Sequence, residues 1–165
     1  MRLRPFIPST DFDIIKNWIT DERTHAMWCA NRFNYPLERS NFTGIISIHA
    51  EKKGDAPFVA TTDDGKVVGF FCYSLNIAEN EGMLKFVMVD PKYRGKGVAR
   101  EMLALALKYA FEITKADSVQ LYVFSETIRA VKCYSNVGFT ERHTDREAFR
   151  FGSEYWGRCN MVIKK

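Results

Sequence analysis

The chain has 165 residues, with 24 Lys and Arg against 20 Asp and Glu and a formal net charge of +4. Hydrophobic residues make up 46% and aromatic residues 14%, which excludes a disordered chain and predicts a single domain over residues 1–165. No apolar run approaches the roughly 20 residues that span a bilayer, and the opening MRLRPFIPST lacks the apolar segment of a secretory signal. We therefore expect a cytoplasmic protein with no membrane partner.

The cysteines and histidines are too scattered to suggest a disulfide framework or a metal site. Neither a CxxC pair nor an HxxxH or HExxH pattern occurs. The residues concerned are Cys29, Cys72, Cys133, Cys159, His25, His49 and His143. The basic residues are spread as well, except for one cluster over residues 92–100, so we expect a small anionic ligand and no nucleic-acid partner.

The first third of the chain predicts an edge strand followed by helices. The strand covers residues 1–7, and the side chains of Ser9, Thr10 or Asp11 are suited to cap the helix that follows. Apolar residues then recur at helical spacing. The predicted helices span residues 12–19, 21–30 and 37–51.

From residue 57 onward the pattern changes to strands, with helices between some of them. Asp64-Gly65 is typical of a hairpin, Asn80-Glu81-Gly82 of a turn, and the apolar run MLKFVMV of a central strand. The predicted strands span 57–62, 67–77, 83–89, 118–124, 139–151 and 154–163, and the predicted helices span about 96–115 and 127–137. This order predicts an α/β fold, a mixed and mostly antiparallel sheet of six to seven strands with a central parallel pair and flanking helices.

The loop VDPKYRGKGVA, which follows the central strand, has the composition of a phosphate-binding turn. Gly95 and Gly97 let the main chain approach a phosphate without a Cβ in the way. The helix that begins here directs unpaired N–H groups at an anion, and Arg94, Lys96 and Arg100 add charge-assisted hydrogen bonds.

Two common phosphate-binding patterns do not fit this loop. A P-loop requires GxxxxGK followed by Ser or Thr, but the residue after Gly97 is valine. A dinucleotide GxGxxG motif requires a small third residue where this chain has Arg100, and Asp117 precedes a strand instead of ending one. A third pattern, Gln or Arg-x-x-Gly-x-Gly or Ala, is satisfied by Arg94, Gly97 and Ala99.

With that pattern the chain resembles the GNAT (Gcn5-related N-acetyltransferase) superfamily. A second stretch, TIRAVKCYSNVGF, resembles another motif of the family, although Thr127 stands where Asn is usual. The matching residues are Arg129, Ala130, Tyr134, Gly138 and Phe139. The opening LRP, the region of Trp18 and the closing YWGRCNMVI resemble the ribosomal-protein acetyltransferase subgroup. The resemblance covers most of the chain and implies the GNAT fold.

The resemblance implies an N-acetyltransferase that uses acetyl-CoA as cosubstrate, without a metal. The pyrophosphate is expected on the loop, and the pantetheine arm beside the central strand where it splays from the next one. The residues implied in cofactor binding are Val87, Met88, Val89, Arg94, Gly95, Lys96, Gly97, Val98, Ala99, Arg100 and Thr127. A main-chain N–H near Met88 is implied as the donor to the oxyanion.

Acetyl transfer also needs an acid for the leaving thiolate and a base for the amine. A phenol with a pKa of about 10 suits a thiol of about 8.5, so Tyr134 is the predicted acid. Its ring is equally placed to pair with Phe139 across a helix end at Gly138. The base stays open between Glu81, Glu126 and a water chain, because Tyr122 stands where related enzymes often carry Glu.

The acceptor is also open between a small-molecule amine and a peptide N-terminus. Residues 21–37 are expected to wall its site. Trp28, Phe33 and Tyr35 form either that wall or core, and Asp21 or Glu22 would attract an amine.

Direct transfer in a ternary complex is expected, because no cysteine has the partners of a nucleophile; acetylation of Cys133 would contradict it. The alternatives are a non-catalytic CoA-sensing or protein-binding module, and a basic nucleic-acid-binding domain. We expect a monomer or a homodimer, because the long terminal strands can pair within one chain or between two.

Overall fold

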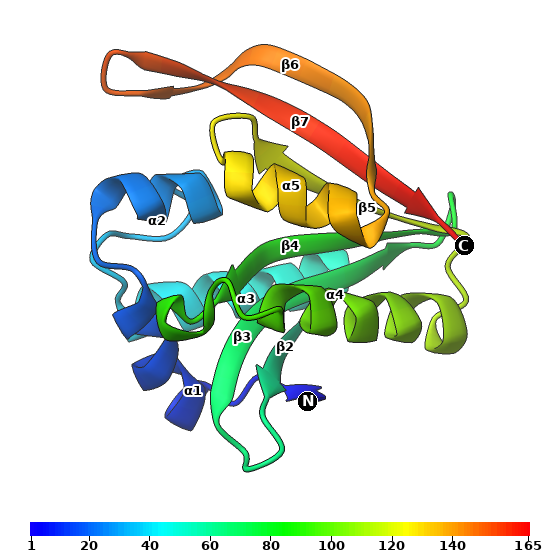
Figure 1. Cartoon of the computed structure of the whole chain (residues 1–165). Helices are drawn as coiled ribbons and strands as arrows, with labels where there is room; N and C mark the ends of the chain where they lie inside the picture. The colour runs from blue at the N-terminus through cyan, green and yellow to red at the C-terminus, as the bar shows by residue number, and fades with distance from the viewer.

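The computed structural model describes residues 1–165 and contains one seven-stranded sheet. The strand order is β1-β2-β3-β4-β5-β7-β6, and every neighbouring pair is antiparallel except β4 and β5 (Figure 1). The strands are β1 (Arg2–Pro5), β2 (Ala56–Thr61), β3 (Val67–Asn76), β4 (Glu81–Val89), β5 (Ser118–Phe124), β6 (Thr140–Phe151) and β7 (Glu154–Lys164). The predicted mixed sheet with its central parallel pair is confirmed.

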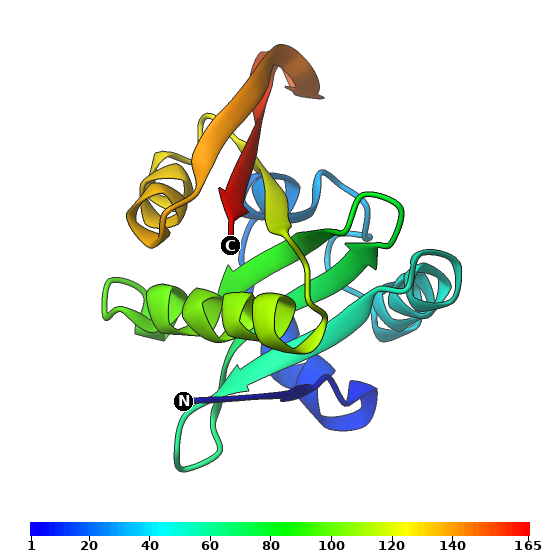
Figure 2. The same cartoon turned by 90° about the vertical axis from the view of Figure 1, so that its right-hand side faces the viewer.

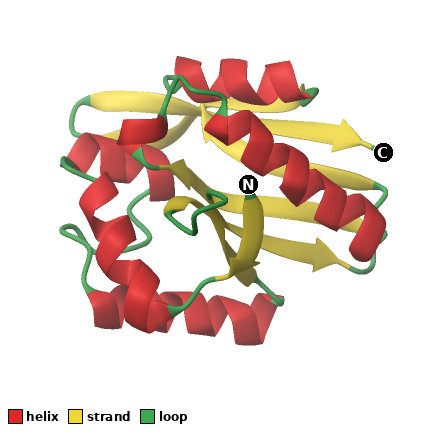
Figure 3. Cartoon of the chain, turned by 60° about the horizontal axis from the view of Figure 1, so that its bottom comes forward, coloured by secondary structure: helices red, strands yellow, loops and turns green.

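Helices cover both faces of this sheet, with α4 and α5 on one side and α1 and α3 on the other (Figures 2 and 3). The helices are α1 (Pro8–Ile15), α2 (Glu22–Cys29), α3 (Arg39–Lys53), α4 (Val98–Lys108) and α5 (Ile128–Val137). Short 3₁₀ turns at Lys16–Trp18 and Pro91–Tyr93 join them to their neighbours. None of the helices combines the length and the apolar character that crossing a bilayer requires.

Alternation along the central strands gives the sheet a core on each face. In β3, Phe71 and Tyr73 join the buried cluster under α4, whereas Phe70 and Cys72 join the cluster under α1 and α3. The near-continuous apolar composition of β3 is therefore explained by burial on both faces.

The first helix begins at Pro8, earlier than predicted, and the side chains at 9–11 do not cap it. Pro8 fits the first helical turn because its missing N–H would be unpaired there. Asp11 is buried instead, and its carboxylate accepts hydrogen bonds from the Ile7 N–H at 2.7 Å and from the Arg4 guanidinium at 2.7 and 2.8 Å. Burial alone would raise the pKa of Asp11, but these contacts lower it overall. Asp11 thus ties β1 to α1.

The long helix predicted to end near residue 115 changes character after Lys108. It continues as one π-helical turn, Tyr109–Ile113, in which the Thr114 N–H donates to the Tyr109 carbonyl at 3.1 Å. The Thr114 hydroxyl donates to the Ala110 carbonyl and contacts the Tyr73 hydroxyl, both at 2.7 Å. These contacts fasten the end of the helix to β3.

Candidate active site

The sheet is open between its two central strands. Pairing of β4 with β5 joins Glu81–Leu84 to Ser118–Leu121 and then ends, and the strands diverge toward the start of α4 (Figure 1). At the same place β4 has a bulge. Its register against β3 shifts there, and Phe86 has a φ of +53°. A left-handed phenylalanine is strained, and such strain is concentrated at functional sites. The structure therefore contains the splay that the resemblance implied.

The open edge of β4 presents main-chain donors. The Asp90 N–H donates to the Val68 carbonyl of β3 at 2.9 Å. Because N–H groups alternate along a strand, that of Met88 also faces β3, and that of Val89 faces the opening. The bulge at Phe86 interrupts this alternation on the other side of Met88.

The loop after β4 adopts the open shape that its sequence predicts. Gly95 and Gly97 have φ values of +74° and +81°, which favour glycine, and a Cβ at either would meet no atom within 4 Å. The Glu101 N–H makes the first bond of α4, to the Gly97 carbonyl at 3.1 Å. The amides of residues 98–100 therefore have no partner within the helix, and no side chain caps it.

The basic side chains of this loop are free to meet an anion. Arg94, Lys96 and Arg100 are exposed and form no salt bridge, and the Lys96 ammonium lies 5.6 Å from the centre of the Tyr93 ring. Three exposed cations thus lie within the same short segment as the unpaired amides of the first turn of α4, a combination that attracts a phosphate.

Tyr134 ends α5 in the motif that the sequence predicts. Gly138 has a φ of +114°, its N–H donates to the Ser135 carbonyl at 3.1 Å, and the Phe139 N–H donates to the Tyr134 carbonyl at 3.1 Å. The Tyr134 and Phe139 rings meet edge to face, with centroids 6.0 Å apart. The packing role of Tyr134 is confirmed, and its role as an acid stays a prediction.

The chemistry of the Tyr134 hydroxyl is compatible with proton donation. Burial raises the pKa of Tyr134, so the phenol remains protonated at neutral pH. The side chain belongs to the same buried cluster as Val89 of β4 and Val123 of β5, the strands that border the opening. Burial also raises the pKa of the Cys133 thiol, which disfavours the thiolate that a nucleophile needs.

Thr127, in the position where Asn is usual, precedes α5 and does not cap it. Its hydroxyl oxygen is buried without a hydrogen-bond partner in the chain. Buried polar atoms are normally paired, so this hydroxyl is available to a ligand.

A cavity of about 370 Å³ lies on the α3 side of the opening, between α2, α3, β4 and β5. Trp28 lines it and donates its indole N–H to the Phe86 carbonyl at 2.9 Å. His49 stacks on Phe86, with centroids 6.2 Å apart. Leu84 and Val123 also line the cavity although they belong to the core on the α4 side, so the cavity reaches into the gap between the strands.

The His49 imidazole is the neutral basic group of this cavity. Its Nδ1 lies 3.4 Å from a carboxylate oxygen of Asp55, whose other oxygen is 2.6 Å from the Lys85 ammonium. Burial first, and then the charge of Lys53, lower the pKa of His49. The imidazole is therefore unprotonated at pH 7 and able to accept a proton.

Glu81 is not positioned as a base, and it does not lie in a turn. It is the first residue of β4, at the end remote from the bulge, and it is buried. Its oxygens accept hydrogen bonds from Ser118 at 2.8 Å, Gln120 at 2.5 Å and Arg142 at 2.5 Å. The Arg142 guanidinium lowers the pKa of Glu81, so the carboxylate serves as a structural anion.

The other predicted acidic groups also lie outside the cavity. Glu126 accepts a hydrogen bond from the Gly157 N–H at 3.2 Å and does not line the cavity. Asp21 caps α2 by accepting from the Thr24 N–H at 2.8 Å. Glu22 lines a second, smaller cavity of about 220 Å³.

Of the three predicted wall aromatics, only Trp28 lines the large cavity. Phe33 packs in the core, and Tyr35 borders the second cavity. Sequence reasoning missed His49 and Arg158, whose guanidinium lies 4.1 Å from the centre of the Tyr122 ring. Neither residue belongs to the loop motif or the α5 motif that predicted the site, and only the tertiary structure places them there.

Comparisons with known proteins agree with this geometry. A family model described as "Acetyltransferase (GNAT) family" matches residues 13–139. A spermidine N(1)-acetyltransferase of Vibrio cholerae is 33% identical over 155 residues, which cover 93% of this chain and 87% of that protein. An N-acetylaspartate synthetase of Xenopus tropicalis is 31% identical over 101 residues, 61% of this chain and 36% of that protein.

The crystal structure of spermidine N-acetyltransferase from Vibrio cholerae with CoA and spermine superposes with a TM-score of 0.82. It is 24% identical and the match covers 99% of this chain and 94% of that one, which supports the GNAT fold. These relatives do not support the narrower resemblance to ribosomal-protein acetyltransferases. The chain belongs to the acetyltransferase (GNAT) family.

Proposed function

We propose that residues 1–165 act as a single N-acetyltransferase domain that moves an acetyl group from acetyl-CoA to a small primary amine. The opening between β4 and β5 is the observation that carries this proposal. The phosphate-binding loop lies at the C-terminal end of β4, and the cavity reaches the gap from the α3 side. A cofactor and an acceptor can therefore meet in the gap from opposite faces of the sheet, as direct transfer requires.

The cofactor is proposed to lie along the loop and the open edge of β4. Its pyrophosphate would accept hydrogen bonds from the amides at the start of α4, with the loop cations around it. Its pantetheine amides would pair with β4, and the Thr127 hydroxyl would give it a further partner. The residues proposed for this role are Val87, Met88, Val89, Arg94, Gly95, Lys96, Gly97, Val98, Ala99, Arg100 and Thr127.

The chemical step follows from the groups around the opening. The amine nitrogen attacks the acetyl carbon, and the N–H of Val87 or Val89 stabilises the oxyanion that forms. The C–S bond then breaks, and the Tyr134 phenol gives its proton to the departing thiolate. His49 takes the proton that the amine loses. The absence of a carboxylate base would favour a non-catalytic CoA-sensing module. With His49 as the base, a carboxylate is not required.

The acceptor is proposed to be a small molecule. The names of the related enzymes support a small amine, and a cavity of about 370 Å³ is in the range of small-ligand sites. A peptide N-terminus, the other acceptor that the sequence left open, has no comparable support.

The test is release of free CoA thiol from acetyl-CoA in the presence of a panel of primary amines. We expect release that depends on both substrates and saturates with each, and intact mass should show no acetyl group on Cys133. Tight binding of acetyl-CoA without thiol release for any amine would favour the CoA-sensing module. Acetyl-Cys133 formed as a kinetically competent intermediate would exclude direct transfer.

A further inference from the structure

The charge of the large cavity bears on the class of acceptor. Four cationic side chains line it, and no Asp or Glu does; the four are Arg32, Lys53, Lys85 and Arg158. Lys85 is paired with Asp55 at 2.6 Å. Arg32, Lys53 and Arg158 have no carboxylate within salt-bridge distance. The cavity thus holds three uncompensated positive charges.

Arg158 is the best placed of these cations. It projects from β7 over the Tyr122 ring of β5, and its guanidinium carbon lies 4.1 Å from the ring centre, within the range of a cation–π contact. This contact leaves the N–H groups of Arg158 available to a carboxylate or a phosphate, which a guanidinium binds with two parallel hydrogen bonds.

We infer that the acceptor is an amine that also carries an oxyanion, either a carboxylate or a phosphate, which Arg158 binds together with Arg32 and Lys53. This inference rests on the proposed acetyl transfer and names the substrate class of the same site. Arg32, Lys53 and Arg158 are exposed, and positive charges gathered along one cavity attract an anion and raise its local concentration. The oxyanion would anchor the molecule while its amine extends toward Phe86 and the gap between the strands.

The same charges disfavour a polyamine, the acceptor in the name of the Vibrio cholerae relative. A polyamine needs carboxylates for its distal ammonium groups, and this cavity offers none. Tyr122, which lies under Arg158, gives this part of the cavity a phenol and no carboxylate. Of the two acidic residues that the sequence predicted for amine binding, Asp21 caps α2 and Glu22 lines the other cavity.

The test compares acceptors that share an amine but differ in charge. One pair is an α-amino acid and its amide, the other is phosphoethanolamine and ethanolamine, and spermidine completes the set. At least one acceptor that carries an oxyanion should have a kcat/KM about tenfold or more above that of spermidine and of the matched amine without the oxyanion. The two pairs distinguish a carboxylate from a phosphate.

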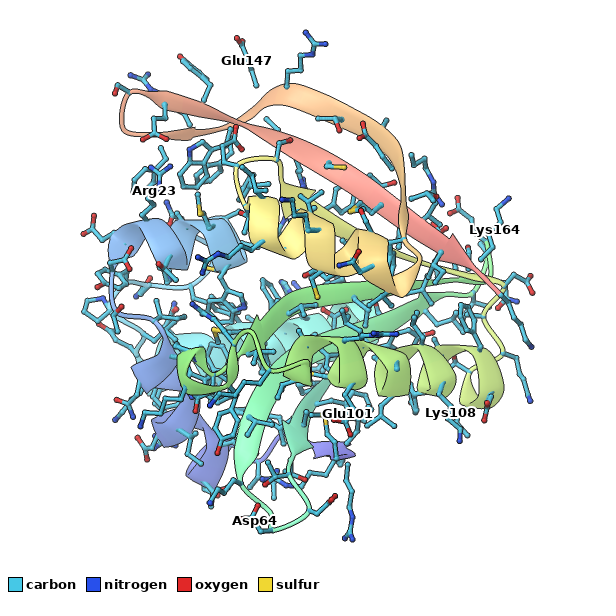
Figure 4. All side chains as sticks on the ribbon, viewed as in Figure 1. Arg23, Asp64, Glu101, Lys108, Glu147 and Lys164 are labelled. Atoms are coloured by element: carbon cyan, nitrogen blue, oxygen red, sulfur yellow. The ribbon has the colours of Figure 1, made fainter.

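Variants then test the assigned residues. Arg158→Gln and Arg32→Gln should each reduce this preference by about tenfold, and Arg158→Lys should restore part of it. Lys164→Gln is the control, because it removes an exposed cation at the far end of the same strand (Figure 4) and should leave the preference unchanged. Calorimetric binding of acetyl-CoA shows whether each variant is folded.

The outcomes separate this inference from the proposed function. Turnover that favours spermidine or the partners without an oxyanion would refute the oxyanion inference and leave the proposed acetyl transfer standing. A preference that Arg158→Gln and Arg32→Gln leave intact would do the same. Absence of acetyl-CoA binding and of thiol release with every acceptor would overturn both.

Discussion

The ring of Tyr134 packs in the core, and its hydroxyl is the proposed acid. The ring packs against Phe139 at the end of α5, and this contact does not involve the hydroxyl. Burial raises the pKa of the phenol, so the phenol is protonated at neutral pH and can donate when the thiolate forms beside it. The residue can therefore stabilise the helix end and serve as an acid.

Tyr134→Phe should separate the two tasks. It removes the proton donor and keeps the ring, so kcat should fall by about a hundredfold, within the usual range for a general acid. The free energy of unfolding and the dissociation constant of acetyl-CoA should hardly change, as denaturant titration and calorimetry would show. Full kcat in a folded Tyr134→Phe variant would remove this residue from the mechanism.

His49→Gln tests the proposed base. At pH 7 the variant should lose about tenfold to a hundredfold in kcat, because the amine must shed its proton without help. The deficit should shrink as the pH approaches the pKa of the amine, where deprotonation in solution no longer needs a base. A deficit that stays constant from pH 7 to pH 10 would indicate that His49 only shapes the cavity.

Among the elements, β4 belongs both to the paired part of the sheet and to the proposed cofactor site. Its first half is fixed by pairing with β5 and by Glu81, which joins β4 to Ser118 and Gln120 of β5 and to Arg142 of β6. Its second half diverges from β5 and carries the bulge at Phe86. One strand can thus be rigid at one end and present free main-chain groups at the other.

Glu81→Gln should weaken the closed end of this opening without affecting the chemistry. At pH 7 we expect a loss of roughly 1–3 kcal/mol in the free energy of unfolding, because Arg142 loses a charged acceptor. The folded pKa of Glu81 is lowered, so its contribution is present above its ordinary pKa and lost as the pH falls through the folded pKa. Urea titrations of the two proteins should therefore converge in acid. A tenfold loss of kcat would instead favour a catalytic Glu81.

The loop and the α5 motif could be predicted because short segments specify them. Gly95, Gly97 and the helix start lie within a few residues, and Tyr134 meets Phe139 across one turn. The sequence put Glu81 in a turn and left it open as a base. Its ion pair with Arg142 could not be predicted, because the two residues are 61 positions apart. The bulge at Phe86 has no sequence signal, since pairing with β3, the aromatic contacts and the Trp28 hydrogen bond together determine it.

At the scale of the whole molecule, the sheet separates two environments. The α4 face presents the loop for the cofactor, and the α3 face holds the cavity, whose side chains come from α2, α3, β4, β5 and β7. Composition and spacing predicted the succession of strands and helices and the central parallel pair, whereas the opening was implied by the family resemblance. They could not predict the cavity, because His49 of α3, Lys85 of β4 and Arg158 of β7 come together only through the strand order and the packing of α3 on the sheet.

Two histidines, the buried His25 and the half-buried His49, should make the stability of the whole chain depend on pH. Burial lowers the pKa of both His25 and His49, so the folded chain binds fewer protons than the unfolded chain below the ordinary histidine pKa of about 6.5. Their contribution is complete above that pH and declines as the pH falls toward the folded values. The free energy of unfolding should fall from pH 7 to pH 5.

A His25→Gln/His49→Gln variant should show a flatter dependence in urea titrations over that range. His143→Gln, which changes an exposed residue of β6, is the control and should keep the wild-type slope. Equal slopes in all three proteins would mean that other groups control the acid response.

The most direct test of the whole account is calorimetric titration of acetyl-CoA into the wild type and into an Arg94→Ala/Gly97→Glu variant. Lys108→Glu is the matched control, because it changes an exposed charge at the other end of α4 (Figure 4). We predict micromolar binding by the wild type and the control, and at least a hundredfold weaker binding, about 2.8 kcal/mol, by the folded loop variant. Equal affinity of the loop variant, or no binding by the wild type, would contradict the placement of acetyl-CoA on which the mechanism depends.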